Sequence, residues 1–199
     1  MSAPRILYRA RQFWHGIRLA PKASELDRVR LVLNPTQFEL FTCMQPAEQS
    51  HSLAVFDKLS SAGEGNKDLL VAALLHDVGK CLYPLKLWER VWIVMGSALF
   101  PGRAREWSRV DSEALRSLAF WKRPFIVAGQ HAQWGAVMAA RANSSALVVS
   151  LIRSHQDTLA GGNPAKGQAY SSEPGTVTFE GDGLGADLLR KLQAADNKS

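Results

Sequence analysis

Residues 69–80, LLVAALLHDVGK, are the most informative stretch of this sequence. The first seven are apolar all around a helix, which is typical of a helix in the middle of a core. Asn66 is placed to cap this helix, and Gly79 is expected to end it. His76 and Asp77 therefore stand at the C-terminal end of a buried helix.

The rest of the chain has mostly helical spacing, which predicts an all-α fold. Asn34 and Pro35 predict a helix start, as cap and first-turn proline. Residues 81–124 predict two or three helices, broken at Pro101-Gly102 and Pro124. The other predicted helices cover residues 5–19, about 46–59, 131–142, 143–155 (capped by Asn143-Ser144) and 184–195. A Gly/Ser/Pro-rich loop is predicted over about 160–183, with residues 176–179 its only strand-like run.

Length, charge and cysteine content limit the class of protein. A chain of 199 residues, 46% hydrophobic, favours one globular domain. No signal peptide or membrane span is recognisable, so a cytoplasmic protein is expected. Cys43 and Cys81 form no CxxC pair and are expected to be free core residues. The net charge of +6 is concentrated in residues 1–33. This basic segment either forms a solvated face or attracts an anionic partner.

Six residues are candidate metal ligands. They are His51, His76, Asp77, His131, His155 and Asp196. The four histidines and Asp196 stand three, four, seven or eight positions from apolar residues of the same helical pattern, so these five are expected to point inward. A single inward histidine is usually a hydrogen-bonded core residue. Two buried aspartates among histidines are best explained by a bound cation, because burying an unpaired carboxylate costs several kcal/mol.

This ordered pattern resembles the HD-domain superfamily of metal-dependent phosphohydrolases over residues 46–199. His76-Asp77-Val78-Gly79-Lys80 looks like the family's signature, and Asp196 like its closing aspartate. The resemblance implies an all-α, HD-domain-like helical bundle, with residues 1–45 as a basic N-terminal helical extension packed on the core. Residues 81–124 would be a helical insertion and residues 160–183 a flexible loop.

The resemblance also implies a division of roles. His51, His76, Asp77 and Asp196 would hold a first metal, and Asp77 would bridge to a second held by His131 and His155. Asp77 and Lys80 would be the catalytic residues, with Lys80 neutralising a phosphate oxygen or assisting the leaving group. The cofactor is expected to be one or two divalent ions, manganese or iron first, with zinc, cobalt, nickel or magnesium as alternatives. Substrate phosphates are assigned from charge alone to Arg103, Arg105, Arg109 and Arg116.

Two groups within the superfamily share features with this chain. Bacterial dinucleoside polyphosphate hydrolases share the ligand order and the small size. HD-GYP cyclic-dinucleotide phosphodiesterases share His-Asp-Val-Gly-Lys and a helix like the one that starts at His131. This chain departs from the second group, because it has Ser154-His155 where paired histidines are expected and only Gly162-Asn163-Pro164 where the Gly-Tyr-Pro loop belongs.

The expected function is hydrolysis of a nucleotide-like phosphoester or phosphoanhydride by metal-activated water. The partner would be a small anionic phosphorylated substrate, with no stable nucleic-acid or membrane partner. One alternative is a two-iron oxygenase on the same scaffold. Another is a regulatory module with a structural metal, in which the basic N-terminal helix binds nucleic acid or membrane.

Overall fold

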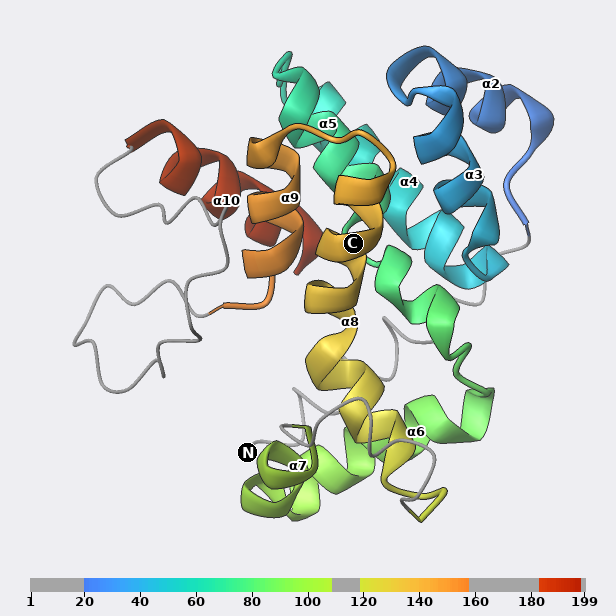
Figure 1. The fold of residues 1–199 in the computed structure, drawn as a ribbon, viewed down its shortest axis with the longest axis vertical. Helices are drawn as coiled ribbons and strands as arrows, with labels where there is room; N and C mark the ends of the chain where they lie inside the picture. Colours follow the sequence, from blue (N-terminus) through green and yellow to red (C-terminus); the bar gives the residue numbers. More distant parts are fainter. Residues whose placement is uncertain (1–19, 109–118, 158–182, 198–199) are drawn as a thin grey trace.

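A computed structural model describes residues 20–108, 119–157 and 183–197, and within them every regular element is a helix (Figure 1). The prediction of an all-α fold is confirmed. The predicted helix over residues 5–19 and the strand-like run at 176–179 lie outside the described residues, as does the loop at 160–182. The elements are α2 (Ala23–Val32), α3 (Pro35–Cys43), α4 (Pro46–Ser61), α5 (Lys67–Leu75), the 3₁₀ helix η1 (Val78–Leu82), α6 (Leu87–Leu99), α7 (Pro101–Ser108), α8 (Arg123–Arg141), α9 (Ala146–Ser154) and α10 (Gly183–Asp196).

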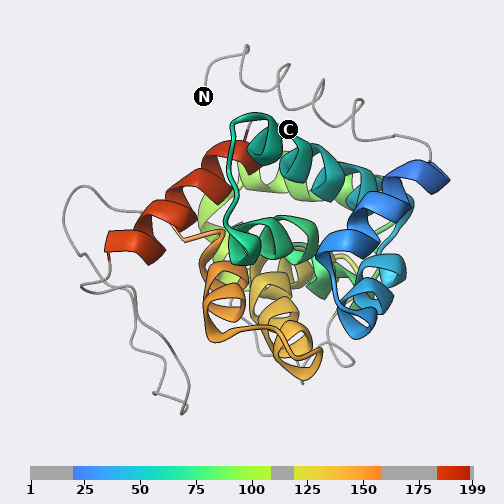
Figure 2. The same ribbon diagram turned by 90° about the horizontal axis from the view of Figure 1, so that it is seen from above.

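Helix α5 lies at the centre of the core, as its sequence predicts. All its residues from Leu69 to Leu75 are buried except the half-buried Leu70. Helices α4, α9 and α10 pack around it, and the view from above shows α5 between α4 and α9 (Figure 2). Each fully buried leucine contributes roughly 2 kcal/mol of hydrophobic stabilisation, so this helix holds the bundle together and fixes the position of the residues that follow it.

Local sequence signals explain where most of these helices start. The Asn34 side chain accepts a hydrogen bond from the Gln37 backbone N–H, and Pro35 occupies the first turn of α3. The Asn66 side chain caps α5 by accepting from the Leu69 N–H. Pro46 begins α4 as predicted. These caps and prolines satisfy or remove backbone donors that a helix start leaves without partners.

Two predicted helix starts are wrong. Helix α8 begins at Arg123, eight residues before His131, because Pro124 sits in its first turn, where proline is tolerated, and does not break it. The cap of α9 is Ser145, whose hydroxyl accepts from the Val148 N–H. Asn143 instead closes α8 in a left-handed conformation with φ 57°. His131 therefore lies in the middle of a long helix.

Gly79 does not end α5 as a left-handed residue; it belongs to η1, and among the described glycines only Gly63 has a positive φ. Its function is close packing. A Cβ at Gly79 would lie 2.0 Å from the backbone oxygen of His131 and 2.7 Å from the backbone nitrogen of Gly135. Only glycine allows η1 to lie directly against α8 in this way.

Residues 87–108 form α6 and α7, which pack against the first half of α8 at the lower end of the molecule (Figure 1). Trp92 and Trp107 surround Phe125, with ring centroids 6.2 and 5.1 Å from it. Cys81 is partly buried, but Cys43 is exposed at the end of α3, contrary to the expectation of two core cysteines. No helix in the described part of the chain is long and apolar enough to cross a membrane.

Candidate metal centre

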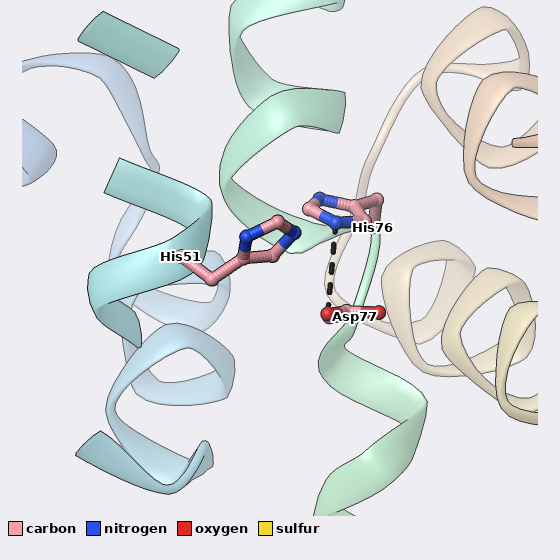
Figure 3. A group of neighbouring side chains, drawn as sticks. All are labelled: His51, His76 and Asp77. Carbon is pink, nitrogen blue, oxygen red and sulfur yellow. Dashed lines mark ion pairs between the residues drawn. The ribbon is translucent and has the colours of Figure 1, made fainter. Parts of the chain in front are cut away.

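The six candidate ligands come from five separate segments. His51 lies on α4, His131 in α8, and Asp196 is the last residue of α10. His76 and Asp77 connect α5 to η1, and His155 directly follows α9. Figure 3 shows His51 reaching from α4 toward His76 and Asp77. His76, Asp77, His131 and His155 are buried, while His51 and Asp196 are partly exposed at the edge of the cluster.

The first group of side chains consists of His51, His76 and Asp77, whose ligand atoms all lie within 4.8 Å of one another. Asp196 joins this group from α10. Its Oδ1 accepts a hydrogen bond from His51 Nε2 at 2.8 Å and lies 3.7 Å from His76 Nε2. Lys58 on α4 also donates to the Ala195 backbone oxygen at 3.2 Å, which fastens the end of α10 beside His51.

The second group consists of Asp77, His131 and His155, again with all ligand atoms within 4.8 Å. Asp77 is shared between the two groups, and its two oxygens face different histidines. Oδ1 lies 3.3 Å from His131 Nε2, whereas Oδ2 lies 3.6 Å from His76 Nε2. A carboxylate placed in this way can contact two cations at once.

The hydrogen bonds of three histidines fix which ring nitrogen is free. Nδ1 of His76, His131 and His155 lies 2.7 to 3.0 Å from the backbone oxygen of Ala73, Val127 and Ile152 respectively. A carbonyl only accepts, so each Nδ1 carries the proton and donates. In the neutral ring the lone pair is then on Nε2, the arrangement found in metal-binding histidines.

Two of these Nε2 atoms, in His76 and His131, are buried and have no hydrogen-bond partner in the described part of the chain. A buried nitrogen without a partner costs free energy unless a hydrogen-bond donor or a metal ion binds its lone pair. Neutral imidazole nitrogens and carboxylate oxygens are together a suitable donor set for first-row divalent metals. The residues present therefore fit the one or two ions that the sequence suggests.

The electrostatics of the cluster favour the neutral forms of His76 and His155 and the charged form of Asp77. Burial, with smaller effects of His76 and His131, lowers the pKa of His155 to about 3, and burial also lowers the pKa of His76. Burial alone would raise the pKa of Asp77, but Lys80, His76 and His131 outweigh it and hold that pKa well below its ordinary value. Metal binding needs these protonation states, because protonated ligands cannot coordinate.

Lys80 faces the same carboxylate. Its Nζ donates to Asp77 Oδ2 at 2.7 Å, and its side chain is partly exposed. The assignment of substrate phosphates to four arginines stays a prediction. Arg103 is exposed on α7, the side chain of Arg105 is not described, and Arg109 and Arg116 lie outside the described residues.

Two residues that support the cluster were missed in the sequence. The Gln193 amide on α10 donates to the backbone oxygens of His155 (3.1 Å) and Asp157 (2.7 Å), so it ties the segment that carries His155 to the helix that carries Asp196. Glu48, one turn before His51 on α4, is buried and paired with Arg90 of α6. Each of the two residues stands three positions before a candidate ligand, and this spacing is the signal by which the sequence could have indicated them.

Comparison with known protein families gives one result. The family model described as HD domain matches residues 49–182, well over half of the chain. The matched range contains His51, His76, Asp77, His131 and His155 and ends before Asp196. No curated protein and no solved structure matches the chain.

Proposed function

The chain belongs to the HD-domain family, a superfamily of metal-dependent hydrolases, and from the arrangement of its ligands we propose that it is a phosphohydrolase. The substrate class we propose is a small nucleotide-like phosphoester or phosphoanhydride.

The placement of Asp77 carries this proposal. Its two oxygens face two groups of histidines, His51 with His76 and His131 with His155. Within each group, Asp77 included, all the ligand atoms lie within 4.8 Å of one another. When bound there, two divalent ions would supply a water nucleophile and neutralise the charge of a phosphoryl group. A single ion in either group would use the same residues, with Asp77 as a ligand in both cases.

The protein's own residues have distinct roles in this proposal. Three backbone carbonyls orient His76, His131 and His155 so that their Nε2 atoms face inward. Lys80 holds a positive charge next to Asp77 on a partly exposed side chain, where it would meet a phosphate oxygen or the leaving group. Manganese or iron is the proposed metal, since the donors are both nitrogen and oxygen.

Phosphate release tests the proposal. Purified full-length protein loaded with Mn²⁺ would be assayed on dinucleoside polyphosphates, cyclic dinucleotides and nucleoside phosphates. We expect metal-dependent hydrolysis of at least one class, with Asp77→Ala reduced to background. The matched control is Asp57→Ala on α4, which removes a surface carboxylate paired with Arg28 at 2.7 Å and should keep activity.

Two results would contradict the proposal. Oxygen consumption with an iron-loaded protein and no phosphate release would favour the oxygenase alternative. Metal binding without turnover on the whole panel, together with salt-dependent binding to DNA or RNA, would favour a regulatory module.

A further inference from the structure

Helix α6 carries an apolar stripe that the fold leaves exposed. Leu87, Val91, Met95 and Leu99 follow one another at every fourth position, and Trp88 lies beside them. Each of these five side chains is between 42% and 64% exposed. Residues at this spacing share one face of a helix, so the five form a continuous apolar strip with no charged residue in it.

Residues on both sides of the stripe attach α6 to the rest of the protein. Arg90 pairs with Glu48 and also donates to Gln45 Oε1 at 2.6 Å on α4. Trp92 donates to the Trp121 backbone oxygen at 3.0 Å, and a Cβ at Gly96 would lie 2.4 Å from the ring of Phe125. Because these contacts fix the rotation of α6, the stripe stays turned outward.

Phe120 enlarges the stripe and is 66% exposed. Phe100, which follows the last residue of α6, is 51% exposed. The ring of Phe120 meets that of Trp88 edge-on, with centroids 6.4 Å apart. Contiguous exposed apolar surface of this kind marks an interaction site, whereas scattered single residues do not.

The surrounding charge is positive. The described residues of 81–123 contain two acidic residues, Glu89 and Glu106, and six basic ones, Lys86, Arg90, Arg103, Arg105, Lys122 and Arg123. Of the six, Arg90 is compensated by Glu48. Lys86 precedes the stripe, Arg103 follows it, and Lys122 and Arg123 follow Phe120, so cations stand at both ends of α6.

This charge distinguishes the possible partners. A second copy packed antiparallel on the stripe would bring Lys86 of one chain toward Arg103 of the other, which is repulsive. An anionic lipid surface would instead complement both ends, and an apolar face with aromatic residues and flanking cations is typical of helices that lie in a membrane interface. We propose that the α6 stripe docks the protein on an anionic membrane surface. This proposal departs from the expectation, drawn from sequence, of no membrane partner.

The size of α6 is consistent with lying on a bilayer and not with crossing it. Its 13 residues span about 20 Å, less than the roughly 30 Å of a hydrocarbon core. The stripe would enter the interface while Arg90 and Gly96 keep the helix on the protein.

Vesicle flotation with the full-length protein tests this proposal. We expect binding to vesicles of phosphatidylcholine with phosphatidylglycerol, weakened by salt, and much less binding to phosphatidylcholine alone. Val91→Glu/Met95→Glu should weaken binding by about tenfold or more, since each buried apolar side chain contributes on the order of tenfold in affinity. The matched control is Leu31→Glu on α2, which changes a leucine that is 87% exposed and should leave binding unchanged.

Circular dichroism and thermal unfolding would verify that the variants fold. The variant Lys86→Gln/Arg123→Gln gives a second test, because it leaves the stripe intact, and it should also weaken vesicle binding. Unchanged binding by the folded stripe variant, or no binding by the wild type, would overturn the proposal. So would a dimer that the stripe variant converts to monomer without any vesicle binding. Asp77→Ala should bind vesicles normally, which separates this proposal from the one on catalysis.

Discussion

Replacement of Gly79 by alanine should damage both stability and the metal centre. The new Cβ would lie 2.0 Å from the His131 backbone oxygen and 2.7 Å from the Gly135 backbone nitrogen, whereas ordinary contacts begin at 3.4 Å. Both obstructing atoms belong to the backbone of α8 and cannot rotate away. Helix α8 and η1 would therefore have to separate by about 1 Å or more, estimated from the shortfall in contact distance.

Overpacking costs typically 1–3 kcal/mol. Because the obstructing atoms are backbone atoms of α8, Gly79→Ala should lower the free energy of unfolding by about 3 kcal/mol or more. The same separation would move Asp77 away from His131, whose Nε2 lies 3.3 Å from Asp77 Oδ1. Urea denaturation would measure the loss in the free energy of unfolding, and metal analysis the loss of bound ion.

Two other glycines provide matched controls. A Cβ at Gly135 would meet its nearest neighbour at 3.2 Å, and alanine gains about 1 kcal/mol of helix propensity there, so Gly135→Ala should change stability by less than about 1 kcal/mol. Gly65 has nothing within 4 Å of its Cβ position, so Gly65→Ala should be nearly neutral. If Gly79→Ala were as stable as Gly135→Ala, the close packing of η1 on α8 would not determine the site.

Three further predictions concern the support of the cluster. Arg90→Met should lower the free energy of unfolding, measured by urea denaturation, by about 2–4 kcal/mol, because it leaves Glu48 buried without its partner. The double variant Arg90→Met/Glu48→Met should recover most of that loss, and equal losses in the single and double variants would contradict this prediction. Gln193→Ala should weaken metal binding about 10- to 100-fold in a titration by releasing the segment of His155, while Gln133→Ala on the exposed side of α8 should not. With metal removed by a chelator, the free energy of unfolding should fall by at least about 2 kcal/mol between pH 7 and pH 5. The unfolded chain binds a proton at His155 near the ordinary pKa of 6.5, and the folded chain, with a pKa of about 3, does not; the lowered pKa of His76 adds a loss of the same sign. Equal stability at the two pH values would show that His155 is not held neutral by burial.

Sequence periodicity was sufficient for the parts of the fold that depend on local chemistry. The all-round apolar α5, its Asn66 cap and the proline starts of α3 and α4 follow from residues within one or two turns. The start of α8 did not, because proline both breaks helices and begins them, and the outcome depends on whether Phe125 and Ile126 find a core to enter.

The candidate ligands could be identified from sequence, but their geometry could not. Offsets along single helices indicated that His51, His131 and Asp196 point inward, since that depends on helical period alone. Which oxygen of Asp77 faces which histidine depends on how α8 approaches η1. The role of Gly79 in that approach, and the direction in which the apolar stripe of α6 faces, depend on contacts between distant segments.

The most direct measurement is the content of divalent metal in purified protein, determined by inductively coupled plasma mass spectrometry. We predict one or two ions per chain in the wild type and in Asp57→Ala, and a clear loss in a folded Asp77→Ala variant, because Asp77 belongs to both ligand groups. A wild type that binds no divalent ion after exposure to Mn²⁺ or Fe²⁺, or an Asp77→Ala variant that keeps its full complement, would contradict the assignment of this cluster as a metal centre.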